Sequence, residues 1–218
     1  MTARAENANA RRPRVLVTGF GPFPGAPENP SEALVNAFAV RSPVSPSVCD
    51  LALEVLPVEY AAVPERLSVL GRDFSPDIAI HFGLSDRARG FTLERLARNE
   101  IRAEKPDIRG EKGGGGPIRE GAGDLVSTLP LKAIAETLSA NGLPVYWSDD
   151  AGGYLCNYLF FLSQGHLCGG FAPAMAGFIH VPPLRDETFT GDMLERGALA
   201  VIETCCRNWM ARSGQSGP

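Results

Sequence analysis

The sequence predicts an α/β fold, in which helices cover both faces of a largely parallel β-sheet. Short apolar runs rich in valine and isoleucine alternate along the chain with segments of helical periodicity. At 218 residues, with 44% hydrophobic and 21% charged residues, the chain has the length and composition of one globular α/β domain. A chain of this length buries enough surface to fold without disulfides or metals.

The first half of the chain supplies three strands and two helices. Residues 14–20 (RVLVTGF) are short, apolar and rich in valine, which predicts a buried strand. The helix expected over 29–40 begins with Asn-Pro-Ser, in which Asn29 or Ser31 can cap the first turn. The next expected elements are a strand over 49–60, a short helix over 61–73 and a buried strand over 77–84.

The middle of the chain is less regular. Residues 91–104 have helical propensity, but their apolar spacing is irregular. Residues 105–124 form a polar, glycine-rich loop with four consecutive glycines, Gly113–Gly116. No Lys-Ser/Thr pair follows these glycines, so a flexible flap is favoured over a phosphate cradle.

The alternation of strands and helices resumes in the second half. The expected elements are a helix over 129–142, a strand over 143–150, a helix over 154–167, a strand over 174–184 and an amphipathic helix over 191–212. In a largely parallel sheet, functional loops gather beyond the carboxyl ends of the strands. Three candidate loops begin there, after Phe20, Gly83 and Trp147.

Charge and cysteine content argue against several classes of protein. The formal net charge of −4 disfavours a broad nucleic-acid surface, and no run approaches the roughly 18 apolar residues of a membrane span. Five cysteines in no paired-spacing framework indicate reduced thiols in a cytoplasmic protein. Residues 1–12 lack the apolar core of a secretory signal, which predicts a frayed polar extension before one domain over 13–218. No His/Cys pair has zinc-ligand spacing, so no metal site is expected.

Cys156 is the first candidate for chemistry. It follows the acidic, glycine-rich segment 148–153, where an aromatic and helix-like run begins. If Asp149 or Asp150 caps that helix, Cys156 falls in the first turn, where the helix dipole and free N–H groups stabilise a thiolate and can hold an oxyanion. The alternative is a buried structural cysteine, which position alone favours.

Two further side chains could complete a nucleophilic site. His180 ends an apolar strand, which suits a general base, although a histidine hydrogen-bonded to a carbonyl at a strand edge is the plainer interpretation. Glu94 could orient the imidazole, but singly it is one of 25 acidic residues. Phe20 and Phe23, between glycines and prolines, could flank a flat ligand or only pin their loop to the core.

Four blocks, taken in order, resemble the pyroglutamyl peptidase I (pyrrolidone-carboxylate peptidase) family of cysteine peptidases. They are VLVTGFGPFPGAPENPS (15–31), FTLERLARN (91–99), SDDAGGYLCNYLFF (148–161) and AGFIHVPPL (176–184). The likeness spans about residues 14–212 and is weakest in the second block. It implies a three-layer α/β/α sandwich of the phosphorylase/hydrolase-like kind, with a mixed, mostly parallel sheet in which the second block is extended rather than helical.

The resemblance also implies an activity, the removal of N-terminal pyroglutamate (5-oxoproline) from peptides by acyl transfer. In that reaction Cys156 is the nucleophile, His180 the general base and Glu94 the orienting carboxylate. No metal or organic cofactor is implied, and the usual assembly in the family is a homotetramer.

The resemblance assigns the substrate pocket as well. Phe20 and Phe23 would sandwich the pyroglutamyl ring, and Asn29 would set the loop around it. Gly83 and Leu84 would contribute the backbone that meets the ring amide.

Four features depart from the family pattern: Leu84, Glu104, Tyr158 where histidine is usual, and the glycine-rich flap over 110–124. Leu84 stands where glutamine is usual, and Glu104 stands where the family tends to carry an arginine thought to assist the oxyanion. These departures leave two alternatives open: a cysteine amidohydrolase acting on another small lactam or amide, and a non-catalytic binding protein that retained the fold.

Overall fold

The computed structural model describes residues 11–102, 105–184 and 187–213. Residues 1–10 of the expected N-terminal extension, and Glu104, lie outside these ranges. Arg11 and Arg12, the last residues of that extension, form ion pairs with Asp77 and Asp50.

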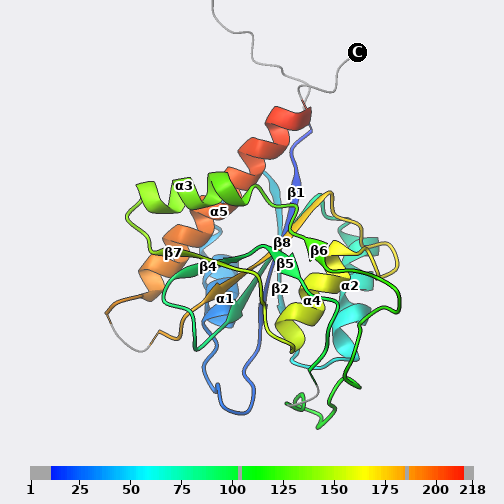
Figure 1. The fold of residues 1–218 in the computed structure, drawn as a ribbon. Coiled ribbons are helices and arrows are strands. Elements are labelled where there is room, and N and C mark those ends of the chain that lie inside the picture. The colour runs from blue at the N-terminus through cyan, green and yellow to red at the C-terminus, as the bar shows by residue number, and fades with distance from the viewer. Residues whose placement is uncertain (1–10, 103–104, 185–186, 214–218) are drawn as a thin grey trace, which may run out of the picture.

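Among these described residues, six strands form the main sheet, and two short strands pair beside it (Figure 1). The main strands are β1 (Arg14–Phe20), β2 (Asp50–Leu56), β3 (Ile78–Leu84), β4 (Phe91–Glu94), β7 (Val145–Ser148) and β8 (Met175–Val181). The short pair is β5 (Leu96–Ala97) and β6 (Leu125–Val126). The order across the main sheet is β2-β1-β3-β8-β4-β7. Only the β4–β8 pairing is antiparallel within this sheet as described, so the sheet is mixed and mostly parallel, as expected.

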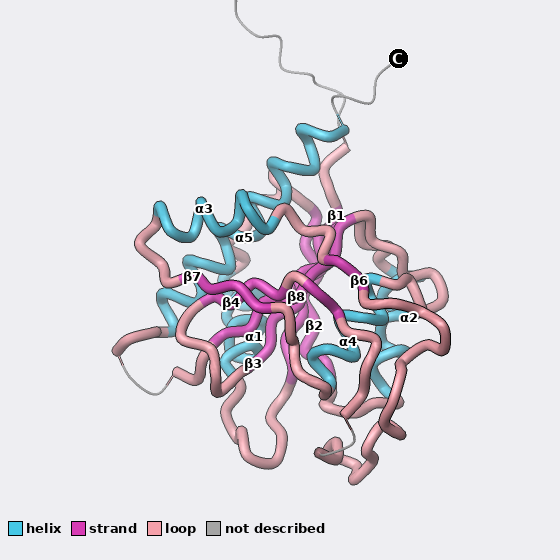
Figure 2. Tube along the Cα trace, viewed as in Figure 1, coloured by secondary structure: helices cyan, strands magenta, loops and turns pink. Residues whose placement is uncertain are grey.

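In the described part of the chain, five helices cover the sheet on two faces (Figure 2). They are α1 (Pro30–Arg41), α2 (Ala62–Asp73), α3 (Leu131–Ala140), α4 (Leu155–Gln164) and α5 (Gly191–Ser213). Buried residues of α1, α3 and α5 belong to one hydrophobic cluster, and those of α2 and α4 belong to another. Over the described residues, none of these helices is both long enough and apolar enough to span a bilayer.

Side-chain alternation along the central strands builds both clusters. On β1, Val15 and Val17 join the cluster of α1, α3 and α5, whereas Leu16 between them joins the cluster of α2 and α4. All three are fully buried. Burial of a side chain of this size stabilises the fold by about 1.5–3 kcal/mol. A central strand with two buried faces therefore needs the continuous apolar run seen in its sequence.

The segment after Gly90 is extended, as the resemblance implies, and its helical propensity is overridden. Phe91 and Leu93 are fully buried in the cluster of α1, α3 and α5. Thr92 and Glu94 alternate to the opposite face, which α4 covers. Tertiary pairing of β4 with β8 and β7 decides the conformation, because propensity contributes only tenths of a kcal/mol per residue.

Side-chain hydrogen bonds anchor the glycine-rich loop over 105–124 near both of its ends. The Asp107 carboxylate accepts hydrogen bonds from backbone N–H groups, including that of Tyr60 at 2.9 Å. The Asn99 side chain accepts from Arg119 N at 2.9 Å and donates to Arg119 O at 2.8 Å. Glycine suits the turn over Gly113–Gly116 because all four residues have positive φ.

Candidate active site

The start of α4 places Cys156 at the carboxyl end of the parallel strands. Tyr154 is the N-cap residue, so Cys156 is the second residue of the first turn, as expected. Tyr154 makes no side-chain cap bond, and the prediction that Asp149 or Asp150 caps this helix is wrong. Asp150 Oδ1 instead accepts from Gly152 N at 3.0 Å and shapes the loop before the helix. The first N–H groups of α4 are therefore left without a side-chain cap, where they can meet an oxyanion.

Cys156 differs from the other four cysteines in its exposure. All five are free thiols, but Cys156 alone is partly exposed and lines a pocket. The remaining cysteines are buried in the two cores: Cys49, Cys168, Cys205 and Cys206. The alternative of a buried structural cysteine therefore fits these four positions better than it fits Cys156.

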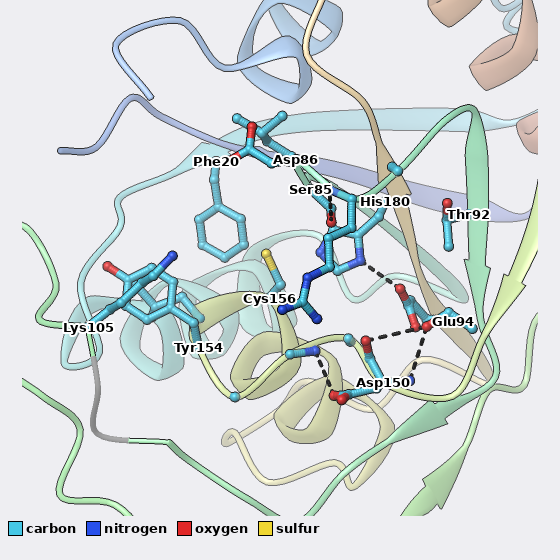
Figure 3. Close-up of a pocket in the computed structure, with 18 of the residues that line it drawn as sticks. Phe20, Ser85, Asp86, Thr92, Glu94, Lys105, Asp150, Tyr154, Cys156 and His180 are labelled. Carbon is cyan, nitrogen blue, oxygen red and sulfur yellow. Dashed lines mark hydrogen bonds and ion pairs between the residues drawn. The ribbon is translucent and has the colours of Figure 1, made fainter. Parts of the chain in front are cut away.

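His180 and Glu94 come together beside Cys156, with the carboxylate behind the imidazole (Figure 3). His180 Nδ1 donates to Glu94 Oε1 at 2.7 Å, and both side chains are buried. This bond sets the orientation of the ring and leaves Nε2 available to the neighbouring Cys156 thiol (Figure 3). The three residues come from α4, β8 and β4, and antiparallel pairing of β8 with β4 makes the His–Glu contact possible.

The electrostatics of this row favour a charged imidazole. Burial by itself lowers the pKa of His180, but the charge of Cys156 and the hydrogen bonds to Cys156 and Glu94 outweigh burial and raise that pKa to about 10. The raised pKa keeps the imidazole protonated at neutral pH. A charged imidazole beside a sulfur favours the thiolate, which is the reactive form of a cysteine.

His81 is excluded as the base by its surroundings. It is fully buried inside β3, where Nδ1 contacts Thr18 Oγ1 at 2.8 Å and Nε2 contacts Ser163 Oγ at 2.9 Å. Burial lowers its pKa to about 3, so the ring stays neutral. It links β1, β3 and α4 as a structural residue.

Gly83 lies directly beside the sulfur of Cys156. A Cβ built at this position would be 3.0 Å from Cys156 Sγ and 2.6 Å from Cζ of Phe178. Glycine is therefore needed here for close approach rather than for a special backbone conformation. The next residue, Leu84, is partly exposed and lines the pocket.

The loop after β1 forms another wall of the pocket. Phe20 is buried with its ring beside Cys156 (Figure 3), and Phe23 is partly exposed, its ring 6.3 Å from that of Tyr154. Asn29 holds this loop in shape, because Nδ2 donates to Gly21 O at 3.0 Å while Oδ1 accepts from Ser31 N at 3.1 Å. The same Asn29 contact to Ser31 caps α1, as one of the two expected alternatives.

All the residues expected at the site line this pocket, except Gly83. Several further residues line it that were not expected from the sequence. The pocket has a volume of about 810 Å³, within the range of sites that bury a whole small ligand. The missed residues include Thr92, Arg102, Lys105, Tyr146, Asp150 and Tyr154. Thr92 could have been predicted, because it lies two residues before Glu94 on a strand and therefore points to the same face of the sheet. The others reach the pocket only through tertiary structure.

Arg102 clamps the loop that leads into α4. Its backbone N–H donates to Gly153 O at 2.8 Å, and its guanidinium lies 3.3 Å from Asp150 Oδ2. The side-chain stem packs so closely that a Cβ on Gly153 would be 2.2 Å from Arg102 Cγ. One side chain thus contacts both ends of the 150–153 loop.

Metal ligands do not gather at this site or elsewhere in the described parts of the chain. Over those residues, no group of three or more His, Cys, Asp or Glu side chains is placed to hold a metal ion.

Comparisons with known proteins point to one family. The pyroglutamyl peptidase family model, Peptidase_C15, matches residues 13–201. The pyrrolidone-carboxylate peptidase of Pyrococcus furiosus is 39% identical over 175 residues, which cover 80% of this chain and 83% of that protein. The enzyme of the same name from Thermococcus litoralis is 37% identical, with 80% and 78% covered. A solved structure of mutant pyrrolidone carboxyl peptidase from Pyrococcus furiosus has a TM-score of 0.82 and 34% identity, covering 90% of this chain and 99% of that one.

These matches confirm the predicted family, the α/β fold and the class of enzyme. They extend over most of the chain, so the likeness is not confined to the four sequence blocks. The chain belongs to the pyroglutamyl peptidase family of cysteine peptidases.

Proposed function

We propose that this chain removes N-terminal pyroglutamate from peptides, with Cys156 as nucleophile, His180 as general acid and base, and Glu94 as the orienting carboxylate. One observation supports these roles: the His180 imidazole is hydrogen-bonded to Glu94 and lies beside the Cys156 thiol at the start of α4, which has no side-chain cap. The relatives named pyrrolidone-carboxylate peptidases support the substrate.

Acylation begins from the thiolate–imidazolium pair. Cys156 Sγ attacks the carbonyl carbon of the pyroglutamyl residue, and the carbonyl oxygen becomes an oxyanion held by N–H groups at the start of α4. The intermediate collapses when the imidazolium of His180 gives its proton to the leaving amine. The shortened peptide departs, and the pyroglutamyl group remains on sulfur as a thioester.

Deacylation uses the now neutral His180. The imidazole takes a proton from a water molecule as that water attacks the thioester carbonyl, and a second oxyanion occupies the same N–H groups. Collapse releases 5-oxoproline and restores the thiolate beside an imidazolium. Glu94 keeps the ring aligned through both stages, because its bond to Nδ1 does not depend on the substrate.

Recognition of the pyroglutamyl ring is assigned to the carboxyl ends of β1 and β3 and to the loop after β1. The rings of Phe20 and Phe23 supply flat apolar surfaces, and Asn29 holds their loop in place. The backbone of Gly83 and Leu84 supplies polar groups for the lactam amide. A free N-terminal amine is rejected, because the aromatic faces of Phe20 and Phe23 offer little to replace the water lost by a charged ammonium.

The assignment is tested with a pyroglutamyl arylamide as reporter. The parent protein is expected to hydrolyse it, and Cys156→Ser is expected to reduce the rate to background. Cys168→Ala, which removes a buried thiol, is the matched control and should retain the rate. Equal rates for the parent and Cys156→Ser would remove Cys156 from the nucleophile role.

We further propose a homotetramer of one-domain subunits, each formed by residues 13–218, in the cytoplasm. The single sheet shared by both hydrophobic clusters supports one domain. The five free thiols support a reducing compartment. Light scattering measures the assembly, and a mass other than four chains would contradict that part of the proposal.

A further inference from the structure

The catalytic pocket is larger than a pyroglutamyl ring requires. The residues assigned to the ring lie around Cys156 on the side of β1 and β3, whereas the pocket of about 810 Å³ continues beyond His180 toward β7. That second part is lined by Thr92 and Tyr146 among others. A peptide substrate has further residues after pyroglutamate. The part of the cavity near Thr92 and Tyr146 is not assigned to the ring and can hold them.

Strand register explains how these side chains line up. Gly83 on β3 pairs with His180 on β8, His180 pairs with Thr92 on β4, and Thr92 pairs with Tyr146 on β7. Residues that pair directly across strands point to the same face of a sheet. The four therefore form one row across the sheet, on the face that carries Cys156.

The row runs from the nucleophile to an exposed aromatic ring. Thr92 lies one strand beyond His180 and Tyr146 lies two strands beyond it, about 9–10 Å away at the usual strand spacing. The Tyr146 side chain is 47% exposed although it borders the catalytic pocket, because β7 is the edge strand. An exposed tyrosine offers a rigid apolar surface that can be covered with little loss of conformational entropy.

The direction of the reaction sets which part of the substrate meets this row. The leaving amine must face His180, which protonates it, and the pyroglutamyl ring lies on the opposite side, by Phe20 and Phe23. An extended peptide advances about 3.3 Å per residue. The first residue after the scissile bond then lies over Thr92, and the side chain of the second reaches Tyr146.

Resting on the proposed function, we propose that Thr92 and Tyr146 form a binding subsite for the leaving peptide, and that Tyr146 selects an aromatic side chain at the second residue after pyroglutamate. The occupant is the peptide substrate itself, because the subsite is continuous with the cavity that holds Cys156 and His180. Specificity for longer peptides therefore resides at the edge of the sheet.

The test compares two peptides, pyroglutamyl-Ala-Phe-amide and pyroglutamyl-Ala-Gly-amide. The parent protein is expected to have the higher kcat/KM for the phenylalanine peptide. Tyr146→Ala is expected to reduce that preference by roughly three- to tenfold, the range of an aromatic pair. Tyr146→Phe keeps the ring and should retain the preference. Val40→Ala, at an 86% exposed apolar position on α1, is the control and should also retain it.

The outcomes separate this proposal from the one on which it rests. Failure to cleave either peptide overturns the proposed function. Cleavage of both peptides with equal kcat/KM by the parent overturns the subsite alone. An unchanged preference in Tyr146→Ala, with a thermal unfolding midpoint matching the parent, also overturns the subsite.

Discussion

Glu94 Oε1 accepts a 2.7 Å hydrogen bond from His180 Nδ1, and both side chains are buried beside the Cys156 thiol. This contact joins two strands that run in opposite directions, although 86 residues separate the partners along the chain. It sets the orientation of the imidazole and, together with the larger effect of Cys156, raises the pKa of His180.

Glu94→Gln is expected to lower kcat/KM by roughly 10²–10⁴-fold, the range of general acid–base catalysis. It is also expected to move the alkaline limit of activity to lower pH. The imidazolium is present below the pKa of His180, which is raised to about 10, and is lost as the pH rises through that value. Removing the carboxylate removes one cause of the raised pKa, so the proton is lost earlier. The pH dependence of kcat/KM on a pyroglutamyl arylamide measures both effects.

Glu136→Gln, at an exposed position on α3, is the matched control for this carboxylate. Its pH profile should overlay that of the parent protein. An unshifted alkaline limit in Glu94→Gln would show that Glu94 does not set the charge of His180.

Gly83→Ala is expected to impair the nucleophile with little change in the fold. The added methyl group would lie 3.0 Å from Cys156 Sγ and 2.6 Å from Phe178, so one of these side chains must move. A displacement of about 1 Å can cost on the order of 10²-fold in rate. Single-turnover hydrolysis measures the loss, and alkylation of Cys156 by iodoacetamide should slow in parallel. Gly123→Ala, where nothing lies within 4 Å of the new atom, should behave as the parent does.

Arg102→Met is expected to lower kcat more than it raises KM. The variant keeps an aliphatic stem against Gly153 but loses the guanidinium that binds Asp150, so the loop entering α4 is held less firmly. That loop positions the N–H groups that are assigned to bind the oxyanion. Their hydrogen bonds to the oxyanion form in the transition state and not in the bound substrate. Arg109→Met, which removes an exposed pair with Glu59, is the control. A change confined to KM would instead place Arg102 in substrate binding.

Stability is expected to fall in mild acid because of His81. Its pKa is about 3 in the folded protein and near the ordinary 6.5 when unfolded, so unfolding takes up a proton as the pH falls through this window. His81 alone should reduce the free energy of unfolding by about 2 kcal/mol between pH 6.5 and 5. The raised pKa of His180 does not mask this slope, since its contribution is complete below 6.5 and is lost only as the pH rises toward 10.

Urea unfolding at pH 7, 6 and 5 measures this dependence. His81→Gln should be less stable than the parent at pH 7, because it disturbs the buried contacts to Thr18 and Ser163. The difference between the two proteins should shrink toward pH 5. Parallel slopes for both proteins would contradict a neutral, buried His81.

Local patterns in the sequence were enough to predict most elements of the fold. Periods of 2 and 3.6 depend only on which side chains are apolar, so the strand of residues 14–20 and the helix carrying Cys156 could be placed without long-range information. The same patterns failed at residues 91–97, where helical propensity lost to pairing with β8 and β7. The resemblance to a family supplied the extended conformation there. It also singled out Glu94 among 25 acidic residues.

The sequence by itself determined the alternation of elements, the position of Cys156 in a first helical turn and the position of His180 at a strand end. Only the tertiary structure decided that Gly83 lies beside the sulfur, that Tyr154 rather than Asp149 or Asp150 begins α4, and that His180 and Tyr146 lie in one row. The physical reason is that these contacts depend on strand order and register. Strand order and register come from pairing and burial between segments far apart in the chain. The local spacing of apolar residues therefore does not predict them.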